Sequence, residues 1–137
     1  MPTAKQEKPA SLDAVFGSLK KVLSRHVPPF KVKAGSIRNK QDFHLIVPQP
    51  VAIPGAYGGK PTDLALASII HQKGYVGFYF TPVYAHPPLG KKLSPALMKC
   101  LKGKSCFCLK KLDDGLLQGI EEALQVGTEF FRDRGWL

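Results

Sequence analysis

Residues 63–81 read DLALASIIHQKGYVGFYFT, which is two apolar runs of strand length around a short turn. Gly74 stands in that turn, where a positive φ is often required, so the stretch predicts a β-hairpin. Alternate residues of the second run share a face: Val76, Phe78 and Phe80 on one side, and Tyr75, Gly77 and Tyr79 on the other. Because both faces are largely apolar, we expect a central strand with helices over one face and a second cover over the other.

Patterns typical of helices flank this hairpin. Residues 12–23 carry apolar side chains at three- and four-residue intervals after a capping residue, Ser11, and Pro28 ends the pattern. Ser94 followed by Pro95 predicts the start of a short helix, because a capping hydroxyl precedes proline at the first helical position.

The longest helical pattern lies near the C-terminus. Asp113 or Asp114 opens it, an apolar stripe runs through residues 116–131, and Gly135 ends it. Its length and its stripe predict a long helix that packs against the sheet.

Further strands complete the predicted sheet. Residues 42–47 and 105–109 have strand character, residues 31–41 suggest an irregular or edge segment, and residues 51–53 fit a brief edge strand. This order predicts a single compact α+β domain over residues 11–137, with an antiparallel sheet and N-terminal, short middle and long C-terminal helices. Residues 1–10 are polar, contain two prolines, and are expected to form a disordered tail.

The charge is high and unevenly distributed. The formal net charge is +10: residues 1–60 hold ten basic and three acidic side chains, residues 61–112 hold eight and one, and residues 113–137 hold two and six. A positive body favours anionic partners, although scattered lysines also serve solubility. We expect no nucleic-acid partner, because the basic residues form no dense blocks; weak binding independent of sequence stays the alternative.

The apolar runs and the cysteines bear on where the protein acts. The longest apolar runs, residues 64–70 and 75–80, are far shorter than the roughly 20 residues of a membrane-spanning helix. The first ten residues lack the apolar block of a secretion signal, and three cysteines are most simply read as reduced thiols. We therefore expect a cytoplasmic protein that has no membrane partner.

The sequence offers no recognisable catalytic or metal-binding motif. Gly103, Lys104 and Ser105 resemble the end of a P-loop, but Met98 stands where the pattern requires glycine. The four histidines are dispersed, and no nucleophile elbow marks a Ser-His-Asp triad. We therefore expect no catalytic activity, although active sites assemble in space rather than in sequence.

The cysteines allow two interpretations. Cys106 and Cys108 are two residues apart in a predicted strand, so both thiols should point to the same face. With Cys100 and a histidine they could form a metal site, but no Cys-x-x-Cys pair exists and we favour packing in the core.

One binding site can be drawn from the sequence. Lys91 and Lys92 precede the helix start at Ser94, whose free amides attract anions, and Tyr79 and Tyr84 supply phenols on or beside the central strand. We expect these five residues to bind a small anionic ligand. The alternative is an unoccupied basic surface with tyrosines in the core.

Several segments together resemble the YdhG-like domain family, a group of small bacterial proteins mostly of unknown function. They are GYVGFYFTPVY at 74–84, LSPAL at 93–97, LKGKSCF at 101–107, LDDGLL at 112–117 and RGWL at 134–137. The resemblance covers about residues 11–137 and implies a compact α+β domain with an antiparallel sheet.

We expect one of two functions. The first is a cytosolic binding module, without a cofactor, for a small anionic ligand or a protein partner. The second is intracellular iron binding, because one branch of the family is described as a frataxin-like iron chaperone. In this sequence the first helix offers Asp13 among Lys20, Lys21 and Arg25 rather than an acidic ridge, which leaves the acidic C-terminal helix to bind iron.

Overall fold

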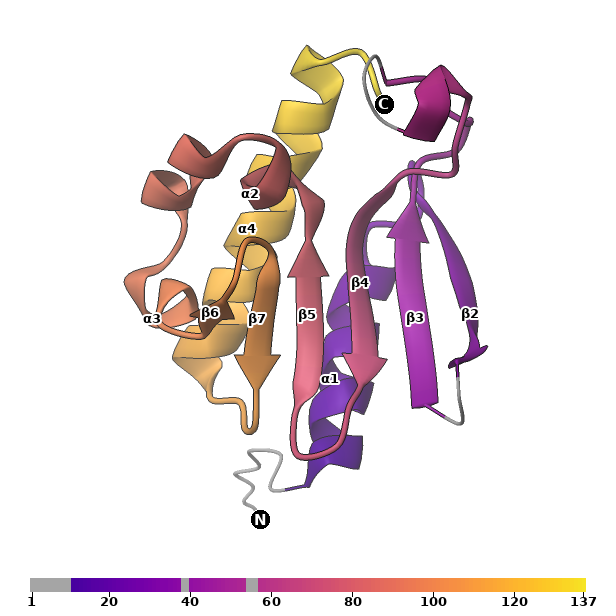
Figure 1. Ribbon diagram of the computed structural model, residues 1–137. Helices are drawn as coiled ribbons and strands as arrows, with labels where there is room; N and C mark the ends of the chain where they lie inside the picture. Colours follow the sequence, from indigo (N-terminus) through magenta and orange to yellow (C-terminus); the bar gives the residue numbers. More distant parts are fainter. Residues whose placement is uncertain (1–10, 38–39, 54–56) are drawn as a thin grey trace.

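The computed structural model describes residues 11–37, 40–53 and 57–137, so the tail predicted for residues 1–10 lies outside the described part. The chain forms an α+β domain built on a six-stranded antiparallel sheet with strand order β2-β3-β4-β5-β7-β6 (Figure 1). The strands are β2 (Lys31–Ile37), β3 (Lys40–Ile46), β4 (Ala65–His71), β5 (Val76–Phe80), β6 (Leu101–Lys102) and β7 (Cys106–Leu109). The helices are α1 (Leu12–Ser24), α2 (Thr81–Ala85), α3 (Pro95–Met98) and α4 (Asp114–Asp133), with 3-10 turns η1 (Tyr57–Gly59) and η2 (Pro87–Lys92).

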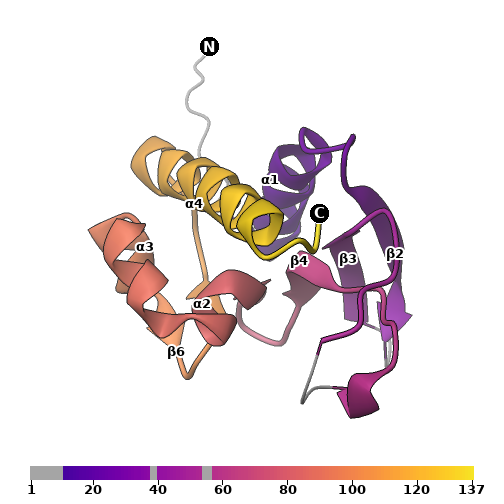
Figure 2. The same ribbon diagram turned by 90° about the horizontal axis from the view of Figure 1, so that it is seen from above.

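The two long helices lie side by side on one face of the sheet, behind it in Figure 1 and above it in Figure 2. The strand side chains under them form the core because the antiparallel register aligns them across the sheet: Phe43, Leu45, Ala67, Ile69, Val76, Phe78, Phe80, Phe107 and Leu109. Burial of this apolar surface is the main force that holds the layers together.

The central hairpin is confirmed. β4 pairs with β5 around a turn in which the N–H of Gln72 donates to the carbonyl of Tyr75 at 2.9 Å, and Gly74 has a φ of 89°. Val76, Phe78 and Phe80 face the helices, as the alternation predicts.

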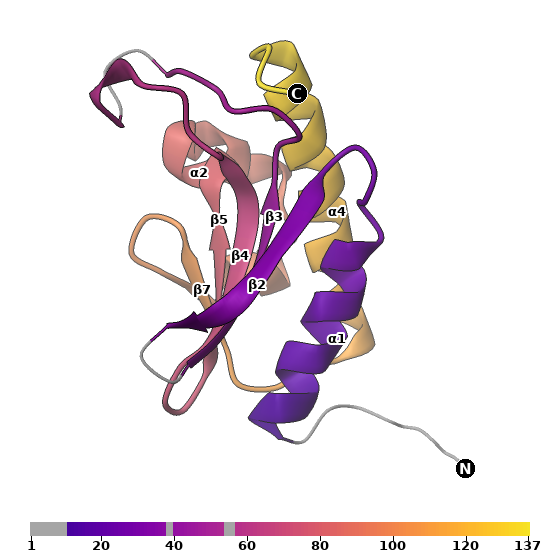
Figure 3. The ribbon, with the colours of Figure 1, turned by 90° about the vertical axis from the view of Figure 1, so that its right-hand side faces the viewer.

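The second cover expected over the opposite face is wrong. No long helix of the described residues lies there (Figure 3), and the protein covers the centre of that face with its own side chain. The Tyr79 ring lies over Gly77, where an added methyl group would stand 2.7 Å from Cε1 of the tyrosine. The phenol therefore shields a backbone position that has no side chain.

A register shift interrupts the pairing of β3 with β4 between Leu45 and Ile46. Beside this irregularity, the consecutive residues Leu66 and Ala67 are both buried, which strict alternation would not allow. The Leu66 side chain meets α4 at Gly127, where a Cβ would come within 2.9 Å of Cδ1. Glycine at this position lets the helix approach the sheet.

The helix ends follow the predicted caps. The side chains of Ser11, Ser94 and Asp113 each accept a hydrogen bond from the first turn of α1, α3 and α4, respectively. Gly135, with a φ of 78°, follows the end of α4 as predicted.

Two short elements after β5 were not predicted. α2 begins directly after β5 with Pro82 in its first turn, and η2 begins with Pro87, so these prolines start helical turns where the sequence suggested a strand end and a loop. Within the described residues, no helix is long and apolar enough to span a bilayer.

Candidate functional site

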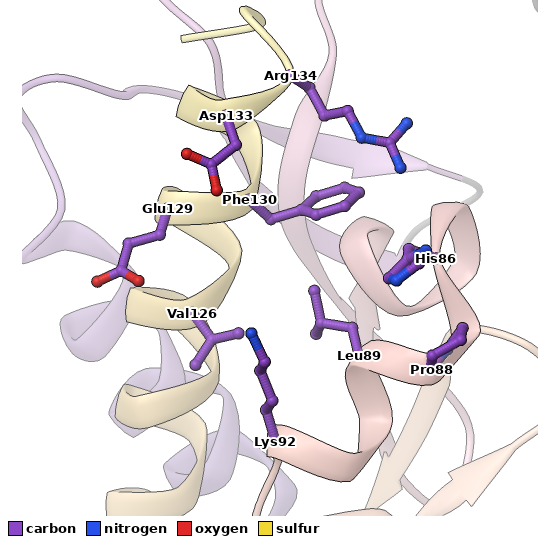
Figure 4. A pocket seen from close by; sticks show the side chains of 9 residues that line it. All are labelled: His86, Pro88, Leu89, Lys92, Val126, Glu129, Phe130, Asp133 and Arg134. Carbon is purple, nitrogen blue, oxygen red and sulfur yellow. The ribbon is translucent and has the colours of Figure 1, made fainter.

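A cavity of about 440 Å³ opens between η2 and the C-terminal half of α4 (Figure 4). The α4 wall is a single helical stripe, because residues three and four positions apart share one face: Val126, Glu129, Phe130 and Asp133. Arg134, the residue that caps α4, continues this wall, while His86, Pro88, Leu89 and Lys92 form the opposite wall. The volume lies within the range of small-molecule sites.

Phe130 is the centre of this cavity. The His86 ring stacks on it with centroids 5.9 Å apart, and the Arg134 guanidinium lies 4.6 Å from its centroid. Trp136 meets it edge-on at 5.9 Å after the chain turns back at Gly135. These contacts fix the ring, so the cavity has a rigid aromatic wall.

The apolar floor is surrounded by charges of both signs. Leu89 is buried and Val126 half-buried, whereas the carboxylates of Glu129 and Asp133 lie on one side of the opening (Figure 4). Arg134 and His86 lie on the other side, and Lys92 reaches from η2 toward α4 (Figure 4).

These charges are not neutralised by one another. Among the described residues, the ion pairs within 4 Å include none of Lys92, Glu129, Asp133 and Arg134. The lining therefore offers cations and carboxylates that form no ion pair within the described part of the chain, around an apolar floor, and this arrangement suits a small organic molecule with a charged end.

The five residues of the predicted anion site lie in different surroundings. Lys92 lines the cavity described above, whereas Tyr84 lines a second, more apolar cavity of about 640 Å³ with Met98 and Leu101. Lys91 is exposed beside Lys92, and the Ser94 hydroxyl is occupied, because it accepts from the Leu97 N–H at 3.3 Å. No described cavity is lined by two of the five residues.

Tyr79 lies on the uncovered face of the sheet. Its hydroxyl accepts a hydrogen bond from Nε2 of Gln72 at 3.1 Å. Burial raises the pKa of this phenol above its ordinary value, although the bond from Gln72 acts in the opposite direction. Tyr79 therefore stays a neutral phenol at physiological pH.

Cys106 and Cys108 share one face of β7, as predicted, but packing in the core is wrong for both. They alternate with the buried Phe107 and lie half-buried on the uncovered face, while Cys100 packs against the core from the α3 end. Burial is the main cause that raises the pKa of Cys100 and of Cys106. Their thiols are weak nucleophiles at neutral pH as a consequence.

The acidic residues of α4 do not gather at one place. Glu121 faces α1 rather than solvent: its Oε2 lies 2.8 Å from Nε2 of His26, and its Oε1 lies 3.8 Å from Arg25. The described residues contain no group of three or more histidine, cysteine, aspartate or glutamate side chains placed to hold a metal ion.

The sequence analysis missed most of this cavity. The spacing of residues 126, 129, 130 and 133 could have indicated one helix face, but the unpredicted turn η2 supplies the opposite wall.

Comparison of the chain with known family models, curated proteins and solved structures finds no significant match. The resemblance to the YdhG-like family therefore stays a prediction.

Proposed function

We propose that this protein is a cytosolic, YdhG-like bacterial binding module without catalytic activity in this cavity, and that its ligand is a small organic anion. The observation that carries the proposal is the position of Lys92 and Arg134, which form no ion pair with any other described residue, beside an apolar floor with Phe130 at its centre. A carboxylate on the ligand would pair with these cations, and its apolar body would cover Leu89 and Val126.

The carboxylates in the lining narrow the ligand class. Glu129 and Asp133 bring two negative charges to the same opening, which would repel a multiply charged phosphate. A ligand with one carboxylate fits better, and an amino group elsewhere on the ligand would find a partner in either acidic side chain. We therefore favour a monocarboxylate or an amino acid with an apolar side chain.

A small ligand accounts for this surface better than a protein partner. Among the described residues, the exposed large hydrophobic side chains are Val27, Val32 and Tyr84, which stand after α1, on β2 and on α2. Protein interfaces usually need a contiguous apolar patch with aromatic anchors. Scattered single side chains do not form one.

Titration followed by Trp136 fluorescence tests the proposal. Trp136 is the single tryptophan of the sequence and touches Phe130, so occupation of the cavity should change its emission. We expect phenylacetate and phenylalanine to bind with dissociation constants below about 1 mM, and phenethylamine, which lacks the carboxylate, to bind more weakly.

Neighbouring lysines provide the matched control. Lys92→Gln should weaken phenylacetate binding at least about tenfold, the effect of losing a hydrogen bond to a charged group. Lys91→Gln removes the same charge from the adjacent residue outside the cavity and should leave binding unchanged. Equal effects of the two substitutions, or no binding of either carboxylate, would contradict the proposal.

Iron binding by the α4 carboxylates is the alternative function, which the family resemblance implies. This function is supported by the resemblance alone. Glu121 already contacts His26 and Arg25, and no contact among the described residues favours an iron site.

A further inference from the structure

A row of polar side chains crosses the uncovered face of the sheet. The register places Lys33 opposite His44, His44 opposite Ser68, Ser68 opposite Tyr79, and Tyr79 opposite Cys106. Figure 1 shows the strands that carry this row, with α1 and α4 behind them. A hydroxyl, Ser68, thus lies between an imidazole and a phenol on a face without a covering helix.

Ser68, His44 and Asp42 form a connected triad within this region. Nδ1 of His44 lies 2.7 Å from Oγ of Ser68, and Nε2 of the same ring lies 3.4 Å from Oδ1 of Asp42. In the tautomer that carries its proton on Nε2, the imidazole turns this N–H toward the Asp42 carboxylate, and Nδ1 accepts from the Ser68 hydroxyl. This is the arrangement of a nucleophile, a general base and a positioning carboxylate.

Burial supports different roles for Asp42 and His44. The Asp42 side chain is 4% exposed, so its orientation is fixed by packing, whereas the His44 side chain is 24% exposed and open to a reactant. Gly35 lies opposite Asp42 on β2, and a Cβ added at Gly35 would lie 3.4 Å from Oδ1 of the carboxylate. The distance of 3.4 Å between Nε2 and Oδ1 is that of an ion-pair contact rather than of a hydrogen bond, and catalytic contacts often tighten only when substrate is bound.

A cavity of about 420 Å³ is lined by Asp42 and His44, and Ser68 lies beside it, opposite His44 in the β3–β4 pair, rather than in its lining. The lining also includes Lys33, Asp63 and the apolar side chains of Ile46 and Ala65. It can hold the body of a small molecule next to the imidazole, with Lys33 as the cation in its wall. This cavity is lined by other residues than the one between η2 and α4.

We propose that Ser68 is a nucleophile for acyl transfer from small carboxylic esters, with His44 as general base and Asp42 as a positioning residue. Oγ of Ser68 attacks the ester carbonyl carbon while its proton passes to Nδ1 of His44. The bond from carbon to the alkoxy oxygen then breaks, and His44 returns the proton to the departing alcohol. The product is an acyl ester on Ser68, which water hydrolyses by the same route.

The strand position of Ser68 limits the rate. β4 lies between β3 and β5, so the backbone N–H groups around Ser68 face the ladder and cannot form an oxyanion hole. The loss of a single oxyanion donor costs roughly 100- to 1,000-fold in catalytic rate in serine hydrolases. We therefore expect acylation by activated esters with slow turnover.

A fluorophosphonate probe and p-nitrophenyl acetate test the proposal on the whole protein. The probe forms a bond from Oγ to phosphorus and releases fluoride, while the serine proton passes to His44. We expect one adduct by intact mass, mapped to Ser68 by peptide mass spectrometry, and a burst of about one equivalent of p-nitrophenolate. Labelling of the native protein at other residues only, or no labelling, would overturn the proposal.

Three variants distinguish activation of the Ser68 hydroxyl by His44 from simple exposure of that hydroxyl to the probe. Ser68→Ala should lose the adduct, and His44→Gln should slow labelling of Ser68 by about 100-fold or more, the usual contribution of a general base. Ser24→Ala is the matched control, because its hydroxyl donates to the backbone carbonyl of Lys20 and faces no imidazole. Labelling of Ser68 at an equal rate in His44→Gln would contradict the assignment.

Asp42→Asn tests the positioning role. The amide can donate to Nε2 and place the imidazole proton on Nδ1, so labelling should slow. A purely structural Asp42 would instead lower thermal stability and leave the labelling rate of the folded protein unchanged.

Discussion

Two glycines inside the long helices have opposite surroundings. A methyl group at Gly127 would lie 2.8 Å from Cζ of Phe80 and 2.9 Å from Cδ1 of Leu66, whereas a methyl group at Gly17 would have no neighbour within 4 Å. We expect Gly127→Ala to lower the free energy of unfolding by about 1 kcal/mol or more, because overpacking outweighs the gain in helix propensity.

Gly17→Ala is the control for this prediction. It should raise the free energy of unfolding by about 0.5–1 kcal/mol, since alanine favours the helix and nothing is displaced. Urea denaturation followed by circular dichroism measures both variants. Stabilisation by Gly127→Ala would show that α4 does not press against β4 as described.

The thiol of Cys106 should react slowly with alkylating agents. Burial raises its pKa, although a hydrogen bond with Tyr79 acts in the opposite direction, so little thiolate is present at pH 8. We expect iodoacetamide to modify Cys106 several-fold more slowly in the folded protein than in urea. The rate in the folded protein should keep rising above pH 9, where the rate in urea levels off, and parallel pH profiles would contradict the raised pKa.

Single side chains show where sequence reasoning reaches its limit. Asp42 and His44 stand two residues apart in a predicted strand, so their common face was readable in advance. Ser68 joins them through a register that the sequence does not fix. The contacts of His26 with Glu121 and of His71 with Asp13 likewise join distant segments.

At the scale of elements, the caps offer a direct comparison between adjacent residues. The Asp113 carboxylate accepts from the Leu116 N–H at 2.8 Å, whereas Asp114 lies within the first turn of α4 and makes no cap bond. We expect Asp113→Ala to lower the free energy of unfolding by about 1 kcal/mol.

Asp114→Ala removes the same charge and should cost less, roughly 0.3–1 kcal/mol, because it loses only the interaction with the helix dipole. Chemical denaturation of both variants at low salt provides the test. A larger loss for Asp114→Ala would place the start of α4 one residue later than described.

The elements that the sequence predicted well are those with a strong local signal. The hairpin around Gly74, the capped helices α1 and α4 and the strand β7 all combine periodicity with a clear start or stop. α2 and η2 were missed because their prolines were read as breakers, although proline also suits the first turn of a helix. Since η2 forms one wall of the ligand cavity, this error also hid the site.

At the scale of the whole molecule, stability should decline in alkaline solution. Burial raises the pKa of Cys100 and Cys106 above 9.0 and that of Tyr79 above 10.0, so the folded protein keeps protons that the unfolded chain loses. Their stabilising contribution is complete below these ordinary values and is lost as the pH rises through the raised ones. The urea midpoint should be lower at pH 10.5 than at pH 8.

Cys100→Ser with Cys106→Ser is the matched variant for this decline. It removes two of these groups, and its urea midpoint should fall less between the same two pH values. An equal fall in the variant and the parent protein would assign the alkaline loss to other groups.

The layers of the molecule were predictable from the sequence, whereas the side chains that cover the second face of the sheet were not. Alternation along β5 indicated which residues meet the helices, because the apolar face of a strand and the apolar stripe of a helix are buried against each other. It could not indicate that the other face would be covered by Tyr79 and otherwise carry a polar row. Both candidate sites depend on such contacts between distant segments.

We expect the cavity between η2 and α4 to bind a small organic carboxylate. Amide chemical shifts recorded during a titration with phenylacetate test it most directly. We expect progressive, saturable shifts around Lys92, Phe130 and Arg134, with the signals of Ser68 and Tyr79 on the uncovered face unchanged. Shifts confined to that face, or no saturable shift at η2 and α4, would contradict it.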